Sequence, residues 1–171
     1  MNAEAIVRRL EAFVEVLPAA ARVSMEEARF KPPSGAWSIL EVVCHLADEE
    51  VDDFRARLGS VLDDPSIALA PIDPEGWARE RRYNEKDLGE AVERFVRERR
   101  ASVEWLRSLR NPDWARAYVH PKFGPTAAGD ILASWPAHDA LHLRQIAKRM
   151  HELAARDAPE FRTGYAGEWR A

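Results

Sequence analysis

The stretch WSILEVVCHLADEEVDDFRARLG, residues 37–59, decides the fold class. It follows a proline- and glycine-rich breaker and opens with an S-x-x-E capping box, Ser38 and Glu41, which marks the first turn of an α-helix. Apolar residues then recur at three-and-four spacing, as on one face of a helix: Ile39, Val43, Leu46, Ala47 and Phe54. We therefore predict a helix from Ser38 to about Leu58, ending near Gly59.

Three further segments have the same helical period, at residues 3–22, 87–109 and 127–155. The inward face of the last should carry Ile131, Leu132, Trp135, Ile146, Met150 and Leu153. Four long amphipathic patterns, without a convincing alternating strand, predict an all-α four-helix bundle. Pro136 stands inside the last helix, where proline removes a backbone hydrogen bond, so this helix could be kinked or restart there.

The connections between the predicted helices differ in length. Residues 59–86 are too many for an ordinary helix connection and include several prolines, so they should be ordered by packing or serve as a lid. We expect a short helical turn at Pro74–Glu80 within them, and a loop from 110 to 126. A long second connection permits a crossover rather than a simple up-down order. One domain should span residues 1–156, followed by an irregular tail at 157–171.

Composition excludes several classes of protein. The chain has 171 residues, 46% of them apolar and 32% charged, which suits one soluble domain with a sizeable core. Its single cysteine, Cys44, cannot form an internal disulfide, as is usual in a reducing compartment. The net charge of −4, with the two signs mixed along the chain, argues against nucleic-acid binding. Without a long apolar run we expect no membrane span and a cytoplasmic protein.

Histidines are the first candidates for chemistry. His138 and His142 are four residues apart on one predicted helix, close enough for both imidazoles to bind one metal ion. This spacing also fits a pair of hydrogen-bonded core histidines. His45 on the other helix could supply a third ligand, but a helical wheel places it opposite the apolar stripe, beside Glu49 and Asp52. Periodicity alone therefore favours a solvent-exposed His45, unless this helix is covered on both faces or lines a cleft.

Three segments together resemble a known family. They are GAWSILEVVCHLADEE at 35–50, DPEGWARERRYNEKDL at 73–88 and HPKFGPTAAGDILASWPAHDALHLRQI at 120–146. The most specific part pairs W-S-x-x-E-x-x-x-H-L with H-D-x-x-H-x-x-Q-I. In these motifs the chain is similar to the DinB/YfiT-like superfamily of metal-dependent four-helix-bundle proteins, over about residues 34–148.

The resemblance implies a site and a range of activities. Position by position, it implies a divalent transition metal, usually nickel or zinc, held by His45, His138 and His142. It also implies a homodimer, and relatives with an assigned reaction include transferases that use low-molecular-weight thiols. Three imidazoles without a fourth protein ligand would form an open site, where a bound water or thiol loses its proton near neutral pH.

Further candidates surround this site, each with a structural alternative. Glu49 and Asp52 could act as general base or orient a ligand, or could form ion pairs on the helix surface. Arg99 lies on an apolar stripe, so it should either pair with Asp139 in the core or bind an anionic substrate. The substrate-binding candidates at the end of the long connection are Arg81, Tyr83 and Asn84, although Tyr83 and Asn84 could equally cap the next helix.

We therefore predict a metal-dependent enzyme that acts on a small molecule, by thiol transfer or by hydrolysis. The alternative is a non-catalytic, dimeric metal-binding or stress-response bundle. Convergence of the three histidines in an open cleft would favour the enzyme, whereas a closed site or an exposed His45 would favour the alternative.

Overall fold

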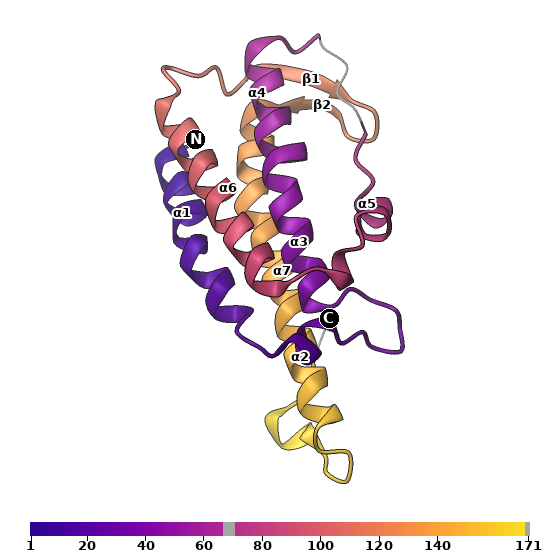
Figure 1. Cartoon of the computed structure of the whole chain (residues 1–171). Coiled ribbons are helices and arrows are strands. Elements are labelled where there is room, and N and C mark those ends of the chain that lie inside the picture. Colours follow the sequence, from indigo (N-terminus) through magenta and orange to yellow (C-terminus); the bar gives the residue numbers. More distant parts are fainter. Residues whose placement is uncertain (67–70, 170–171) are drawn as a thin grey trace.

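A computed structural model describes residues 1–66 and 71–169 and shows a bundle of four long helices (Figure 1). These are α1 (Ala3–Ala20), α3 (Ile39–Asp48) with its continuations η1 (Glu49–Arg55) and α4 (Ala56–Asp63), α6 (Leu88–Ser108), and α7 (Ala128–Arg156). The shorter elements are α2 (Met25–Arg29), α5 (Pro74–Glu80), η2 (Tyr83–Glu85), β1 (Ala117–His120), β2 (Gly124–Ala127) and η3 (Thr163–Ala166). The predicted four-helix bundle is confirmed.

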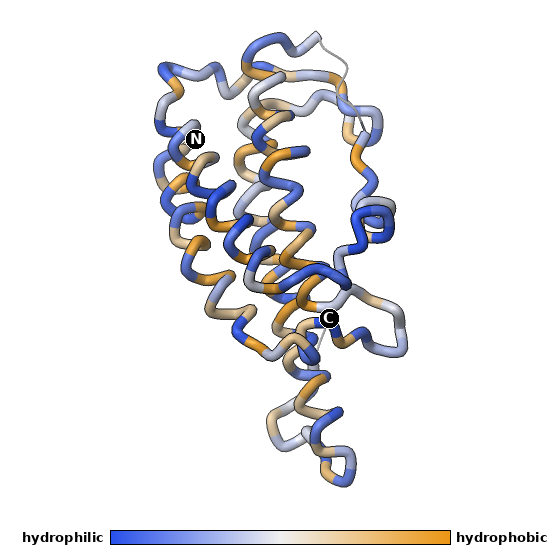
Figure 2. The backbone as a smooth tube through the Cα atoms, in the orientation of Figure 1, coloured by the Kyte–Doolittle hydropathy of each residue, from blue (hydrophilic) through white to orange (hydrophobic). Residues whose placement is uncertain are grey.

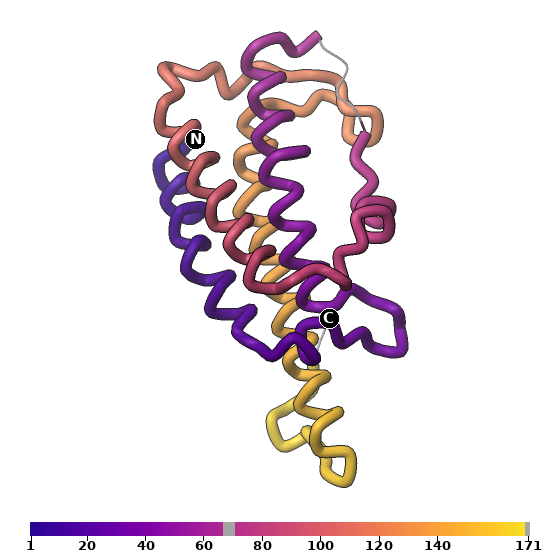
Figure 3. The backbone as a smooth tube through the Cα atoms, in the orientation of Figure 1, coloured from indigo at the N-terminus to yellow at the C-terminus, as the bar shows by residue number. Residues whose placement is uncertain are grey.

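The order of the helices is not simply up and down. Helices α1 and α7 run in one direction, while α3–α4 and α6 run in the other (Figure 1). The chain from α5 to the start of α6 descends along the outside of the bundle, which makes the second connection a crossover (Figure 3). Each of α1 and α3 packs against both α6 and α7, so that α1 and α3 lie diagonally opposite.

The helices pack through one apolar face each, and Figure 2 shows orange and blue residues alternating along them. Two core clusters result. One surrounds α3 and includes Leu17, Val43 and Phe95; the other joins α4 to α7 and includes Leu58 and Trp135. Helix α3 is the exception to the pattern, because all ten of its residues are buried. It is covered by α2, α5, α6, α7 and η2 together.

Several expectations about the elements need correction. The second long helix continues past Gly59 to Asp63, and its middle, η1, is π-helical. Residues 110–126 are not wholly a loop, because β1 and β2 pair as an antiparallel hairpin with Tyr118 opposite Thr126. Tyr118 is the one buried residue of these short strands in the described structure. With a single buried side chain, the strands are too short to show the alternation of apolar and polar residues that predicts a strand. Helix α2 was also not predicted.

Helix α7 runs unbroken through Pro136, so the proline neither ends nor restarts it. The C-terminal part of α7 extends beyond the other long helices (Figure 1). Met150, predicted to point inward, is accordingly 40% exposed. None of the described helices is long and apolar enough to cross a membrane.

Candidate metal centre

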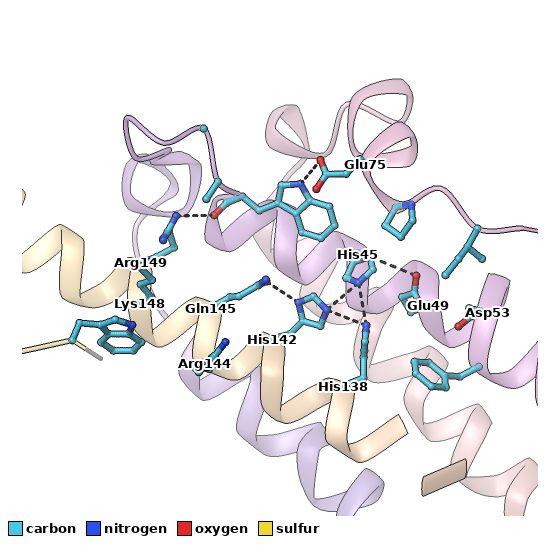
Figure 4. Close-up of a pocket in the computed structure, with 17 residues that line it drawn as sticks. His45, Glu49, Asp53, Glu75, His138, His142, Arg144, Gln145, Lys148 and Arg149 are labelled. Carbon is cyan, nitrogen blue, oxygen red and sulfur yellow. Dashed lines mark hydrogen bonds and ion pairs between the residues drawn. The ribbon is translucent and has the colours of Figure 1, made fainter. Parts of the chain in front are cut away.

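Three histidines from two helices meet at one point. The Nε2 atoms of His45, His138 and His142 lie 3.3 Å, 3.1 Å and 3.0 Å apart in the three pairwise combinations. His45 comes from α3, and the other two come from successive turns of α7 (Figure 4). Nitrogen ligands about 2.0–2.1 Å from a tetrahedral ion would stand about 3.3 Å apart, so the three nitrogens fit one transition metal ion.

The three close contacts cannot all be hydrogen bonds. Each Nε2 of a neutral imidazole is either an N–H donor or a lone-pair acceptor, so at least two of the three atoms are in the same state. At least one contact would then join two donors or two acceptors. A cation at the centre removes the conflict, because all three nitrogens can direct lone pairs at it. This is the observation that fits the residues to a metal.

The electrostatics of the site keep these histidines neutral. Burial, followed by the neighbouring imidazoles, lowers the pKa of His45 to about 2. Burial also leads the lowering of the pKa of His138 to about 3, with His142 and Arg99 contributing. The pKa of His142 is lowered by burial as well. Neutral imidazole is the form that binds metals, so the rings are ready to act as ligands at neutral pH.

Two side chains face the Nδ1 atoms of these rings, one of them within hydrogen-bond distance. Nδ1 of His142 is 2.8 Å from Oε1 of Gln145, an amide oxygen that can only accept, so the proton of this ring resides on Nδ1 and Nε2 is free for a metal. Nδ1 of His45 faces Oε1 of Glu49 at 3.6 Å, the same carboxylate–histidine arrangement that supports many metal ligands. Nδ1 of His45 and Oε1 of Glu49 are both buried, and neither has a hydrogen-bond partner in the described structure.

The buried position of His45 corrects the interpretation from the helical wheel. His45 is 3% exposed, because α3 is buried around its whole circumference and His45 points toward α7 rather than into solvent. The wheel assumed one solvated face. His45 could belong to the site only if its helix was covered on both faces or lined a cleft. The structure meets this condition, because α3 is covered on both faces.

The π-helical segment η1 decides which carboxylates face the centre. A π-turn takes up an extra residue compared with an α-turn, since its hydrogen bonds run from i to i+5. Asp53 therefore reaches the pocket with Glu49, whereas Asp52 lies outside the described pocket lining and pairs with Arg81 at 2.7 Å. Burial, followed by the neighbouring Asp53, raises the pKa of Glu49 to about 8.

The histidines line a pocket of about 670 Å³. Its size suits a small-molecule ligand. Trp37 and Phe54 form apolar walls, and Glu49 and Asp53 flank the histidines on the α3–η1 side (Figure 4). Three basic side chains of α7, together with Gln145, line the side beyond His142: Arg144, Lys148 and Arg149. Trp169 of the C-terminal tail and Glu75 of α5 also line the pocket.

Arg99 does not reach this pocket. Its side chain is completely buried and donates hydrogen bonds to Asp139 at 2.8 Å and to Glu50 at 2.6 Å and 2.8 Å. Glu50 also accepts a hydrogen bond from Nε1 of Trp135. The structural pairing with Asp139 is therefore what the structure shows, and the guanidinium has no access to a substrate in the pocket.

The candidates at 81–84 also lie outside the described pocket lining. Arg81, Arg94 and the hydroxyl of Tyr83 all donate to the buried carboxylate of Asp48. Asn84 contacts the hydroxyl of Ser38 at 2.7 Å. These residues tie the long connection to α3 and α6, and the structure gives each a structural contact in place of the substrate contact that we predicted.

Several pocket residues were missed from the sequence. Asp53 was passed over because an α-helical period was assumed through η1. Gln145 belongs to the H-D-x-x-H-x-x-Q-I motif, so the signal for it was present. Arg144 and Lys148 resemble ordinary surface charges, and Trp169 stands in a tail that we expected to be irregular. Only the return of the tail toward α7, where Trp169 packs on His151, brings it to the pocket.

Comparison with known proteins identifies the family. Residues 7–146 match the DinB superfamily. The chain belongs to this superfamily. Among solved structures, YfiT from Bacillus subtilis, described as "a probable metal-dependent hydrolase with an unusual four-helix bundle topology", superposes with a TM-score of 0.78. At 20% identity, with 89% of this chain and 87% of YfiT covered, the likeness shows a shared fold.

Two proteins that are similar in sequence are each named "putative metal-dependent hydrolase". One, from Oceanobacillus iheyensis, is 27% identical over 114 residues, which are 66% of this chain and 64% of that protein, just under two thirds of its length. The other, from Bacillus licheniformis, is 28% identical over 139 residues, 77% of each chain.

Proposed function

We propose that this DinB-superfamily protein is a hydrolase that depends on one divalent transition metal, zinc or nickel, and acts on a small molecule in the 670 Å³ pocket. The observation that carries the proposal is the convergence of three neutral histidines within 3.3 Å of one another on the wall of that pocket. The names of the two relatives agree with hydrolysis.

The donor set fits the proposal. His45, His138 and His142 would hold the ion, and no fourth ligating side chain joins them among the described residues, as in catalytic rather than structural metal sites. When bound, such an ion polarises a substrate carbonyl and lowers the pKa of a water or thiol.

Side chains of the pocket wall would transfer the proton and surround the reacting groups. Glu49 is the candidate for moving a proton, because its carboxyl lines the pocket beside His45 and one of its oxygens lacks a hydrogen-bond partner. Trp37 and Phe54 add apolar surface to this region, and an apolar surround strengthens electrostatic interactions. Transfer of a low-molecular-weight thiol would use the same groups with a thiol in place of water.

Activity assays on metal-loaded protein test the proposal. Zinc- and nickel-loaded protein is offered a panel of small esters and amides, and in parallel a low-molecular-weight thiol with an electrophile. We expect hydrolysis that disappears with the metal in His45→Ala. In Glu49→Gln, hydrolysis should fall by about 10²–10⁴-fold while the metal is retained.

Three results would overturn the proposal. Conjugation of the thiol without hydrolysis would replace hydrolysis by transfer. Turnover that persists in His45→Ala would remove the metal from the reaction. No turnover on either panel would favour a non-catalytic metal-binding bundle.

A further inference from the structure

Two cations at the mouth of the pocket have no partner in the described parts of the chain. Arg144 and Lys148 are exposed, lie four residues apart on α7 and both line the pocket (Figure 4). Their neighbour Arg149, in contrast, is buried and pairs with Glu152 at 2.9 Å. Arg144 and Lys148 are therefore available to a ligand.

Nearby carboxylates of the pocket do not neutralise these cations. Asp53 pairs with Arg57 at 2.6 Å, and Glu75 accepts a hydrogen bond from Nε1 of Trp37 at 3.2 Å. Glu49 lies on the far side of the histidines, against His45 (Figure 4). In the described lining, Glu49 and Asp53 thus lie on the α3–η1 side of the metal centre and Glu75 comes from α5, while the free cations lie on the α7 side.

Aromatic surfaces border the cationic side. The indole of Trp37 is nearly parallel to the ring of His142, with an interplanar angle of 13° and centroids 6.4 Å apart. Trp169 lines the same pocket, is held against His151 with ring centroids 5.7 Å apart, and is still 37% exposed. Indoles that line a pocket suit a flat apolar group.

We propose that the pocket recognises a small organic anion with a planar apolar group, whose negative end binds Arg144 and Lys148 while its flat part packs on the indoles of Trp37 and Trp169. A carboxylate is the favoured anion, because guanidinium binds it through two parallel hydrogen bonds. The bond to be cleaved would then lie between this anchor and the histidines. This assignment of a substrate class rests on the proposed function, although the binding itself does not require turnover.

Calorimetry on the full chain tests the proposal with a matched pair of probes. The probes are 3-phenylpropionate and its neutral isostere 3-phenylpropanamide, titrated into zinc-loaded and into metal-free protein. We expect the acid to bind at least about tenfold tighter than the amide in both forms, because hydrogen bonds to charged groups are the stronger ones. The metal-free arm separates binding by Arg144 and Lys148 from binding of the carboxylate to zinc.

Two sets of variants complete the test. The double variant Arg144→Gln/Lys148→Gln should abolish the preference for the acid. Arg110→Gln/Lys122→Gln, which removes the same charge outside the pocket lining, should keep it. Trp169→Ala should lower the affinity for the acid and the affinity for the amide by the same factor. Equal binding of the two probes, a preference that survives Arg144→Gln/Lys148→Gln, or a preference that vanishes with the metal would each overturn the proposal.

The result is independent of the test of hydrolysis. A preference for the acid without any turnover would refute the proposed function and leave the anion site standing. Turnover without a preference for the acid would refute the anion site and leave the proposed function standing.

Discussion

Gln145 accepts a hydrogen bond from Nδ1 of His142 at 2.8 Å, and this contact fixes which nitrogen of the ring faces the other two histidines. Glu49 stands in the corresponding place beside His45, at 3.6 Å. Two of the three ligands thus face a second side chain, and one of these side chains, Gln145, is part of the motif that includes His138 and His142. Ligand geometry at this scale depends on these contacts as well as on the histidines themselves.

Replacing Gln145 should weaken metal binding without unfolding the protein. We expect Gln145→Leu to lower zinc affinity by about 10–100-fold, because the ring of His142 loses the acceptor that fixes its tautomer. Gln145→Glu, which retains an acceptor, should bind zinc at least as tightly as the parent. Competition with a chromogenic chelator measures both affinities. A Gln145→Leu variant with the affinity of the parent would show that this hydrogen bond does not support the site.

Individual residues were predictable where a motif specified them. The positions of His138 and His142 follow from helical spacing, but spacing alone could not assign them a metal. His45 required the resemblance, since its own periodicity indicates solvent. Asp53 could not have been chosen over Asp52, because the π-helical turn that exchanges them leaves no recognisable pattern in the sequence.

At the scale of elements, the buried carboxylate of Asp48 joins the long connection between α4 and α6 to the bundle. Asp48 is 1% exposed and accepts hydrogen bonds from Arg81, Tyr83 and Arg94. Burial alone would raise the pKa of Asp48, but the hydrogen bonds from Tyr83 and the two arginines outweigh it and hold the pKa below its ordinary value of 3.8. Asp48 therefore stabilises the fold as a carboxylate.

The stability contribution of Asp48 should depend on pH. Because the folded-state pKa is lowered, the contribution is present above pH 3.8 and is lost as the pH falls through the folded-state value. We expect Asp48→Asn to lower the free energy of unfolding by about 1–3 kcal/mol at pH 7, a figure reduced for the partial exposure of both arginines. Urea denaturation at pH 7 and pH 3 should show this difference shrinking.

The control for this prediction is Asp52→Asn, whose half-exposed pair with Arg81 should be worth less than about 1 kcal/mol. A difference between Asp48→Asn and the parent that is the same at both pH values would contradict the prediction.

Helices were predictable to within a few residues, and the short strands were not. The turn at Pro74–Glu80 and the bounds of α6 and α7 followed from caps and periodicity. The hairpin has only four residues per strand and a single buried side chain, so its sequence cannot be told from a loop. Helix α2, with five residues, is too short to show a period.

Across the whole molecule, a buried ionic cluster connects the two halves of the core. The guanidinium of Arg99 lies over the rings of Phe13 and Phe95 in one cluster and of Trp135 in the other. Glu50 and Asp139 bind it from η1 and α7. The sequence predicted that Arg99 needs a partner, but only the packing of three helices could show that it has two.

Removing Arg99 should therefore destabilise the entire bundle. Arg99→Ala leaves two buried carboxylates without their counter-ion, and we expect a loss of about 3–5 kcal/mol in the free energy of unfolding, measured by urea denaturation. The matched control is Arg107→Ala, whose exposed pair with Glu11 should contribute less than about 1 kcal/mol. Equal stabilities of the two variants would contradict the structural role of Arg99.

Metal content tests the central claim, the three-histidine centre, most directly. Untagged protein, prepared without chelator, is analysed by elemental mass spectrometry beside His142→Ala and His120→Ala, the latter a histidine of the hairpin outside the pocket lining. We expect about one equivalent of zinc or nickel in the parent and in His120→Ala, and a loss of the metal in His142→Ala. Parent protein that contains no metal, and takes up added zinc no better than His142→Ala, would contradict the account.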